Sequence, residues 1–183
     1  MKPNYYVAHP WHGLELGPKA PDELDVFIEL TPQDTVKYEI DKASGFIRVD
    51  RPQKYSNRSP TLYGFIPRTY AGDNDPLDVL VLCQEDIEPL SLVNCYAIGV
   101  IKMIDSDQVD EKIIAIAIGD PSLTQYKDIS ELPAHLLNEM GHFFEIYKSL
   151  EGKKTYILDI GDKTVAEEII QDSMKRYKEI FNK

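Results

Sequence analysis

Residues 73–82 read Asp-Asn-Asp-Pro-Leu-Asp followed by Val-Leu-Val-Leu. The carboxylates of Asp73, Asp75 and Asp78 thus stand at the start of an apolar run that is typical of a buried strand. Crowded carboxylates repel one another, and burying them without partners is costly, but hard divalent cations such as Mg²⁺ accept such oxygen ligands. A polar turn stiffened by Pro76 explains the same residues, so a metal site and a plain turn both remain open from this stretch alone.

A second acidic loop, residues 105–112, follows the apolar run 92–104 and contains Asp105 and Asp110. Neither acidic stretch has the glycine at position six or the glutamate at position twelve of a calcium-binding EF-hand loop. We therefore expect carboxylates from two separate strand ends to converge on shared cations, as in multi-metal phosphoryl-transfer sites. The sequence contains no arrangement typical of Ser-His-Asp or Cys-His nucleophilic catalysis and no glycine-rich phosphate loop. This favours a metal-activated water as the nucleophile.

The chain of 183 residues has the length of one domain, and we expect a single domain over 1–183 that begins with an irregular arm, 1–22. Thirty-one acidic residues against 20 basic ones give a net charge of −11, which argues against nucleic acid and anionic membrane surfaces as partners. No stretch resembles a signal or transit peptide, so we expect a cytoplasmic protein with Cys83 and Cys95 as buried, reduced thiols. Within the arm, we expect His9, Trp11 and His12 to pack rather than to bind a ligand.

Alternating apolar residues predict a series of short strands, and two C-terminal stretches have helical spacing. One helix is expected at about 133–151, and after a strand at 155–159 a final helix is expected with Val165, Ile169, Tyr177 and Phe181 on one face. This order predicts an α+β fold, and bent strands joined by short turns favour a small closed barrel, with OB-like topology as one option, and the two helices beside it. The other expected strands are 26–30, 36–41, 46–50, 77–82, 92–104 and 113–118, with a short aromatic segment at 62–67.

Basic residues near these elements are candidate phosphate ligands. Lys37 shares a strand face with Glu39, and Arg51 stands at a strand end. Lys112 closes the second acidic loop, and Tyr147 and Lys148 fall on the long predicted helix. Each of them singly is typical of solvated surface, and only their combination with the carboxylates indicates a phosphate site.

Taken together, these acidic and basic motifs are similar to those of the family I soluble inorganic pyrophosphatases. Residues 73–79 resemble that family's D-x-D-P-x-D-V signature. The likeness covers about residues 8–151 and includes 36–51, 63–67, 99–103 and 142–148, while the arm at 9–12 is similar to that of plant-type members. The resemblance implies a five-stranded OB-like barrel, Mg²⁺-dependent hydrolysis of pyrophosphate to two phosphates, and a homo-oligomer.

The resemblance also implies roles for single residues. Asp75 is the base that accepts a proton from the attacking water. The implied ligands of the Mg²⁺ ions, several per active site, are Asp73, Asp78, Asp105 and Asp110. The implied ligands of phosphate oxygens are Lys37, Arg51, Tyr63, Tyr147 and Lys148. Further charged residues that line the same cavity are Glu29, Glu39 and Lys112.

Two positions depart from the family pattern. Ser59 stands where bacterial relatives often carry tyrosine, and Ser106 stands where they carry glutamate. Both changes remove secondary ligands and put the rate and the substrate-side metals in question. Two alternatives to pyrophosphate hydrolysis remain: a metal-dependent hydrolase of a larger phosphoanhydride, and a non-catalytic OB-type binding module. A third, weaker alternative is an acidic cation buffer without turnover.

Overall fold

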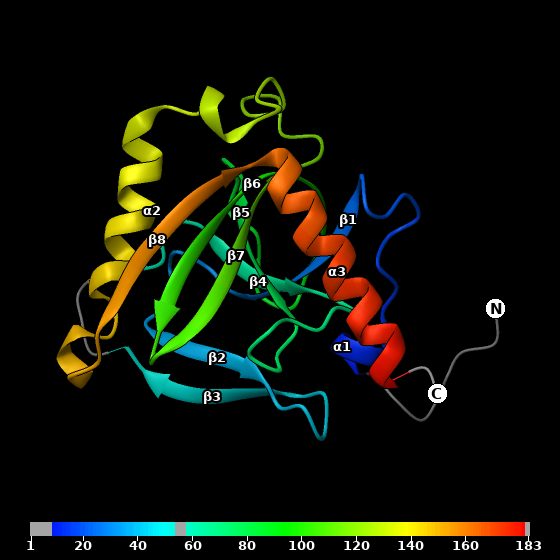
Figure 1. Ribbon diagram of the computed structural model, residues 1–183, viewed down its shortest axis with the longest axis horizontal. Helices are drawn as coiled ribbons and strands as arrows, with labels where there is room; N and C mark the ends of the chain where they lie inside the picture. The colour runs from blue at the N-terminus through cyan, green and yellow to red at the C-terminus, as the bar shows by residue number, and fades with distance from the viewer. Residues whose placement is uncertain (1–8, 54–57, 182–183) are drawn as a thin grey trace.

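The structure, a computed structural model, describes residues 9–53 and 58–181. Two longer helices follow a series of strands, with one strand between the helices (Figure 1). The elements in chain order are α1 (Pro10–Gly13), β1 (Leu24–Leu30), β2 (Val36–Ile40), β3 (Ile47–Pro52), β4 (Leu62–Ile66), β5 (Leu77–Leu82), β6 (Leu92–Asp105), β7 (Gln108–Ala117), the 3₁₀ turn η1 (Ile129–Glu131), α2 (Ala134–Ile146), the 3₁₀ turn η2 (Ser149–Glu151), β8 (Thr155–Asp162) and α3 (Lys163–Phe181).

Five of the strands close into a ring. Their hydrogen-bonded order is β1–β4–β5–β7–β6, and β6 pairs back with β1. The predicted small closed five-stranded barrel with two main helices is therefore confirmed. β5 and β7 run parallel, with Asp78 opposite Lys112, whereas the other pairs in the ring are antiparallel. The long strand β6 extends beyond the ring and also pairs with β8.

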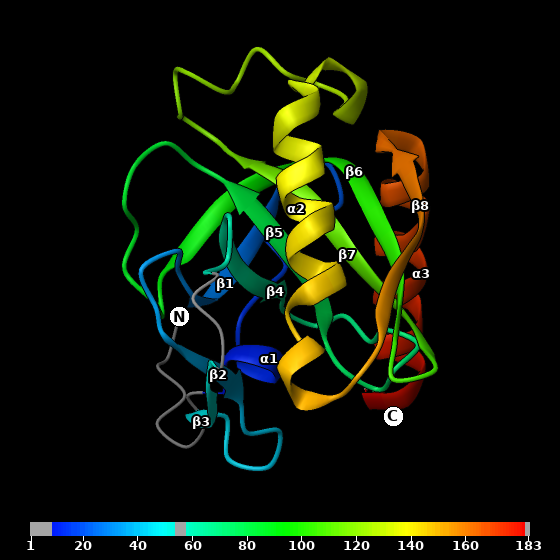
Figure 2. The same cartoon turned by 90° about the vertical axis from the view of Figure 1, so that its left-hand side faces the viewer.

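Apolar side chains fill both sides of the barrel wall. Val79, Val100 and Ile113 are buried inside the barrel, where Ile170 of α3 also contributes. Residues of β5, β6 and β7 that point the other way pack against α2, which lies across a different face from α3 (Figure 2). Burying each of these large side chains contributes about 1.5–3 kcal/mol, so the wall is a rigid support for any side chain at its ends.

Strands β2 and β3 form a hairpin that is a separate two-stranded sheet below the barrel in Figure 1. Its turn contains Gly45 with φ of +76°, and a Cβ there would come within 2.8 Å of the Cα of His9. Glycine is therefore needed for the turn and for the close approach of the arm.

The N-terminal arm differs from the expected irregular segment because it contains the one-turn helix α1. Pro10 occupies the first turn, and the Nδ1 atom of His9 accepts a hydrogen bond from the backbone of His12 at 3.4 Å. As predicted, the arm's aromatic residues pack: Trp11 is buried, and His12 lies 2.6 Å from the hydroxyl of Tyr177 on α3. The part of the arm before residue 9 lies outside the described residues.

Two predicted elements have different ends. The second acidic stretch is a tight hairpin rather than a loop, because Ser106 and Asp107 both have positive φ (52° and 68°) and let β6 pair directly with β7. Asp110 and Lys112 therefore belong to a strand. The helix expected over 133–151 ends at Ile146, since Lys148 leaves helical geometry with φ of −111° and ψ of 5°. No helix among the described residues is long and apolar enough to cross a bilayer.

Candidate active site

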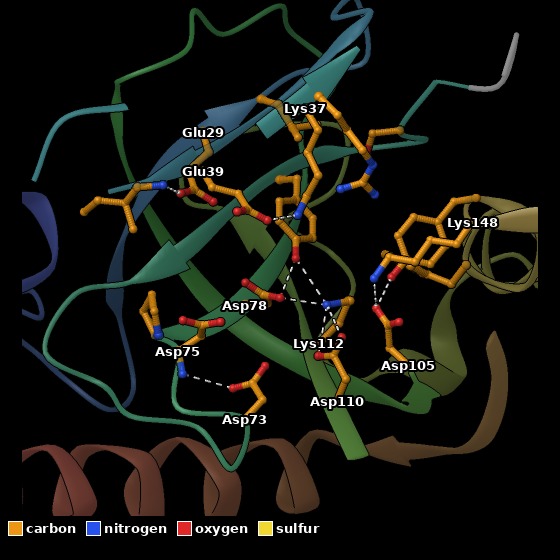
Figure 3. A pocket seen from close by; sticks show the side chains of 18 of the residues that line it. Glu29, Lys37, Glu39, Asp73, Asp75, Asp78, Asp105, Asp110, Lys112 and Lys148 are labelled. Carbon is orange, nitrogen blue, oxygen red and sulfur yellow. Dashed lines mark hydrogen bonds and ion pairs between the residues drawn. The ribbon is translucent and has the colours of Figure 1, made fainter. Parts of the chain in front are cut away.

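One cavity of about 260 Å³ opens between the hairpin, the barrel wall and the end of α2. All thirteen predicted site residues line it, although they come from elements far apart in the chain (Figure 3). The structure thus brings the predicted set together, and the roles of its members remain predictions. Side chains in the lining that were not predicted are Leu30, Ile40, Lys42, Gln53, Ser59, Pro76, Phe143 and Phe144.

The first acidic stretch forms the turn into β5. Asn74 adopts φ of 71°, and Asp73 accepts a hydrogen bond from the backbone of Asp75 at 3.1 Å, so this segment is a polar turn as well as part of the cavity. Asp75 contacts the ammonium group of Lys42. Asp78, two residues into the strand, contacts the hydroxyl of Tyr63 on the neighbouring strand β4.

We call the carboxylates of Asp73, Asp78, Asp105 and Asp110 the acidic wall of the cavity. Lys112 is the central cation of this wall. Its side chain is only 3% exposed, and its Nζ atom lies 2.7 Å from Asp78 and 2.8 Å from Asp110. Burial opposes the charged form of the lysine, but the carboxylates of Asp110 and Asp78 outweigh that effect and raise the pKa of Lys112. This lysine is therefore a buried ammonium group and not the solvated surface charge that its sequence context taken singly suggests.

A third group joins the end of β6 to the end of α2. Asp105 accepts hydrogen bonds from the hydroxyl of Tyr147 and the ammonium of Lys148. Partial burial acts against the carboxylate, yet the bonds from Lys148 and Tyr147 lower the pKa of Asp105 to about 2. The hydroxyl of Ser106 also donates to Asp105, at 2.9 Å, so this departure from the family pattern keeps a contact with the acidic wall.

The hairpin brings basic side chains to the opposite side of the cavity. Lys37 and Arg51 are directly opposite each other in the register of β2 and β3, and Lys37 contacts Glu39. The Nε atom of Arg51 donates to Glu151 of η2 at 2.6 Å. Phosphate groups bound here would meet an ammonium and a planar guanidinium, which suit single-point and forked contacts respectively.

Buried carboxyl groups in the cavity have raised pKa values. Glu29 is 5% exposed and accepts a hydrogen bond from the backbone of Ile40 at 2.8 Å. Burial, followed by the charge of Asp78, raises its pKa to about 8. Burial also raises the pKa of Asp73 to about 6, with Asp78 and Asp110 contributing. The side chains that line the cavity include seven carboxyl groups and five Lys or Arg groups, so the acidic groups outnumber the basic ones.

That excess makes a test of metal fit possible. The carboxylate oxygens that face the cavity are the donors that hard divalent cations prefer, and a cation would offset the burial, and the repulsion from Asp78 and Asp110, that raise the pKa of Asp73. Across residues 9–53 and 58–181, no three His, Cys, Asp or Glu side chains already surround one point as a metal cage. The chemistry of the donors fits Mg²⁺-like ions, in an open site rather than a preformed one.

Some residues at or near the cavity were not predicted to contact the site residues. Ser59, noted from the sequence only as a departure from the family pattern, is buried at the cavity wall, and its hydroxyl donates to the backbone of Thr61 at 2.7 Å. Lys42 and Glu151 were not among the candidates. Lys42 lies within the family-like stretch 36–51, but only the fold shows that it contacts Asp75 and that Glu151 contacts Arg51.

Comparison with known proteins agrees with this geometry. Residues 26–178 match the family model described as "Inorganic pyrophosphatase". The chain is 48% identical to soluble inorganic pyrophosphatase 1 of Arabidopsis thaliana over 94% of its own length and 82% of that protein, and 48% identical to the Zea mays enzyme over 93% and 80%. Among solved structures, inorganic pyrophosphatase from Thermus thermophilus has a TM-score of 0.88 at 35% identity, covering 92% of this chain and 99% of that one. The chain therefore belongs to the family I soluble inorganic pyrophosphatases.

Proposed function

We propose that this protein hydrolyses inorganic pyrophosphate to two orthophosphates and that Mg²⁺ ions, several per active site, bind at the acidic wall of the cavity. One observation carries the proposal: a wall of carboxylates and a set of Lys, Arg and Tyr side chains face each other across a single small cavity. That pairing complements a multiply charged anion that arrives together with cations. Kinship with enzymes named for this reaction supports the same activity.

The residues of the acidic wall would share the work of holding cations. Asp73, Asp78, Asp105 and Asp110 present the carboxylates, and Lys112 keeps Asp78 and Asp110 together before any cation binds. When bound, Mg²⁺ supplies positive charge that neutralises pyrophosphate and acidifies water at the site. Rigid strands under this wall keep the ligands in place, which metal sites require.

The remaining residues act on the substrate and on water. Lys37, Arg51, Tyr147 and Lys148 would donate to phosphate oxygens, and Tyr63 would do so from its place beside Asp78. The cations among these groups stabilise the charge that develops on the leaving phosphate. Asp75 is proposed as the group that accepts the proton of the attacking water. The side chains proposed to support these from the same cavity are Glu29, Glu39 and Lys112.

Phosphate release from pyrophosphate tests the activity. Purified protein with Mg²⁺ should release phosphate, excess EDTA should stop the release, and Mg²⁺ should restore it. A preparation that releases no phosphate above background would overturn the proposal. Competition with ATP distinguishes the alternative of a larger phosphoanhydride, because ATP should compete poorly for a cavity of about 260 Å³.

The substitution Asp75→Asn tests the proposed base. It keeps the size of the side chain but removes its basicity, so kcat should fall by about 10²–10⁴ while folding and metal binding persist. Asp107→Asn is the matched control, since Asp107 is exposed on the β6–β7 turn and does not line the cavity. A near wild-type kcat for Asp75→Asn would remove Asp75 from its proposed role.

We also propose a cytoplasmic homo-oligomer that binds neither nucleic acid nor membranes. The net charge of −11 is unfavourable for anionic partners, and the unbridged thiols of Cys83 and Cys95 suit a reducing compartment. Exposed apolar residues on β8, including Tyr156 and Leu158, offer surface for a second copy. Sedimentation of the purified protein would determine the number of subunits.

A further inference from the structure

Arg51 is held by two carboxylates at the rim of the cavity. Its Nε atom donates to Glu151 at 2.6 Å, and its Nη1 atom donates to the neighbouring Asp50. Burial opposes the charge of the guanidinium, but Asp50 and Glu151 outweigh it and raise the pKa of Arg51. Among residues 9–53 and 58–181, no side chain or backbone oxygen accepts from the Nη2 atom. Two nitrogens of the guanidinium are thus fixed, and toward the described residues its Nη2 donors remain available.

Glu151 is well placed to fix the orientation of Arg51. It lies in η2, the turn that follows Tyr147 and Lys148, and its side chain is only 11% exposed. Gly152 ends this turn with φ of 71°, and the backbone of Lys153 donates to Lys148 at 3.3 Å, so the backbone around Glu151 is constrained. Glu151 does not itself line the cavity.

The bridge also joins two parts of the proposed phosphate site. Arg51 belongs to the hairpin, whereas Tyr147 and Lys148 stand at the end of α2. Within the described part of the chain, β2 and β3 pair only with each other, so side-chain contacts such as this one help to determine where Arg51 stands relative to the end of α2. A guanidinium held in advance loses less freedom when phosphate binds, which lowers the free energy needed for binding.

We infer that Glu151 is a positioning residue for pyrophosphate binding, which acts by orienting Arg51 toward the cavity. The inference rests on the proposed role of Arg51 as a phosphate ligand. Glu151 binds no substrate atom, so its loss should weaken binding of the substrate more than it slows the chemical step. A purely structural tie would instead lower stability and leave the affinity of the folded enzyme unchanged.

The test is a double-mutant cycle with Glu151→Gln and Arg51→Lys, measured as KM and kcat for pyrophosphate at saturating Mg²⁺. A hydrogen bond between charged groups is strong enough for Glu151→Gln to raise KM about tenfold, with a smaller change in kcat. Lysine lacks the forked donors that Glu151 orients, so in the Arg51→Lys background the substitution at 151 should add little. Glu145→Gln is the control, because Glu145 is exposed on α2 and does not line the cavity.

Each other outcome has a defined meaning. If Arg51→Lys raises KM and Glu151→Gln does not, the positioning role is wrong and the proposed phosphate site stands. If Arg51→Lys leaves KM unchanged, Arg51 is not a phosphate ligand, and the inference about Glu151 that rests on this role is overturned with it. An equal rise in KM from Glu151→Gln in both backgrounds shows that Glu151 acts by another route and overturns the inference. If Glu151→Gln does not fold, Glu151→Asp enters the same cycle, because it keeps the charge and shortens the reach.

Discussion

The two sides of the cavity are built in different ways. The acidic wall grows out of β5, β6 and β7, strands of the closed barrel whose main-chain pairing fixes Asp78 opposite Lys112. The basic residues Lys37 and Arg51 belong to the β2–β3 hairpin. Among the described residues, the strands of this hairpin make no main-chain pairing with the strands of the barrel. Side chains hold that hairpin instead, through Glu29 to the backbone of Ile40 and through Arg51 to Glu151.

The difference indicates how the two functions are separated. Cation ligands require fixed geometry, and the barrel wall supplies it through buried strands. A phosphate site that must admit substrate and release product can tolerate an attachment made by a few polar contacts. We therefore expect substitutions in the wall to act on stability and catalysis together, and substitutions around the hairpin to act mainly on substrate affinity or on pH dependence.

The largest effect should come from Lys112→Met. The substitution leaves Asp78 and Asp110 without their buried cation, and breaking a buried ion pair in this way costs about 3–5 kcal/mol of unfolding free energy. Guanidinium unfolding of chelator-treated protein measures the loss, and added Mg²⁺ should recover part of it. Lys154→Met, at an exposed lysine, is the control. An unchanged midpoint for Lys112→Met would contradict the view of the wall as a preformed charged unit.

A smaller effect should come from Glu29→Gln and should depend on pH. The pKa of Glu29 rises from 4.5 in the unfolded chain to about 8 in the fold, so the native state holds the proton more tightly. Stability from this group is complete below about pH 4.5 and is lost as pH rises toward about 8. Glutamine avoids that loss and still accepts from Ile40, so the variant should be more stable than the wild type by about 2–4 kcal/mol near pH 9.

Unfolding of metal-free protein across the pH range measures this difference. Glu39→Gln is the matched control, because Glu39 lines the same cavity with a side chain that is 50% exposed and its charge is the smallest contribution to the raised pKa of Glu29, so its substitution should change the pH profile far less. Parallel profiles for Glu29→Gln and the wild type would show that Glu29 is charged in the fold. The hydrogen bond from the backbone of Ile40 would then be accepted by a carboxylate.

The smallest effect should come from Tyr177→Phe, far from both sides of the cavity. The substitution keeps the ring among the aromatic residues of the arm and removes only the hydrogen bond to His12, which contributes about 1 kcal/mol. Thermal unfolding should detect the change, while pyrophosphate turnover should stay the same. A fall in turnover would mean that the arm acts on the cavity, for example through the contact of His9 with the backbone of Lys42.

Much of the fold could be predicted because its signals are local. The acidic turn at 73–78 followed by an apolar run identified β5, and helical spacing located α2 and α3 to within a few residues. The two acidic stretches were expected to meet, and the barrel does bring Asp110 to Asp78 through Lys112. The tight turn at Ser106 and Asp107 was missed, since neither residue is the glycine or asparagine that usually signals positive φ.

The rest depended on pairing between distant segments. The parallel register of β5 and β7 buries Lys112, and no local pattern distinguishes a buried lysine from a solvated one. The contacts of Glu151 with Arg51 and of Lys42 with Asp75 join residues that are far apart in the chain, and no local spacing indicates them. Single contacts between distant segments leave no regular spacing in the sequence, so this part of a site cannot be predicted from sequence patterns.

The tight turn between β6 and β7 affects how much chain entropy is lost when the cavity forms during folding. The acidic wall lies entirely within residues 73–112, whereas the basic residues are spread from Lys37 to Lys148, and the bridge from Arg51 closes a loop of about a hundred residues. Closing a longer loop removes more conformational freedom from the unfolded chain. The cation side of the cavity therefore requires less loss of chain entropy to form than the phosphate side.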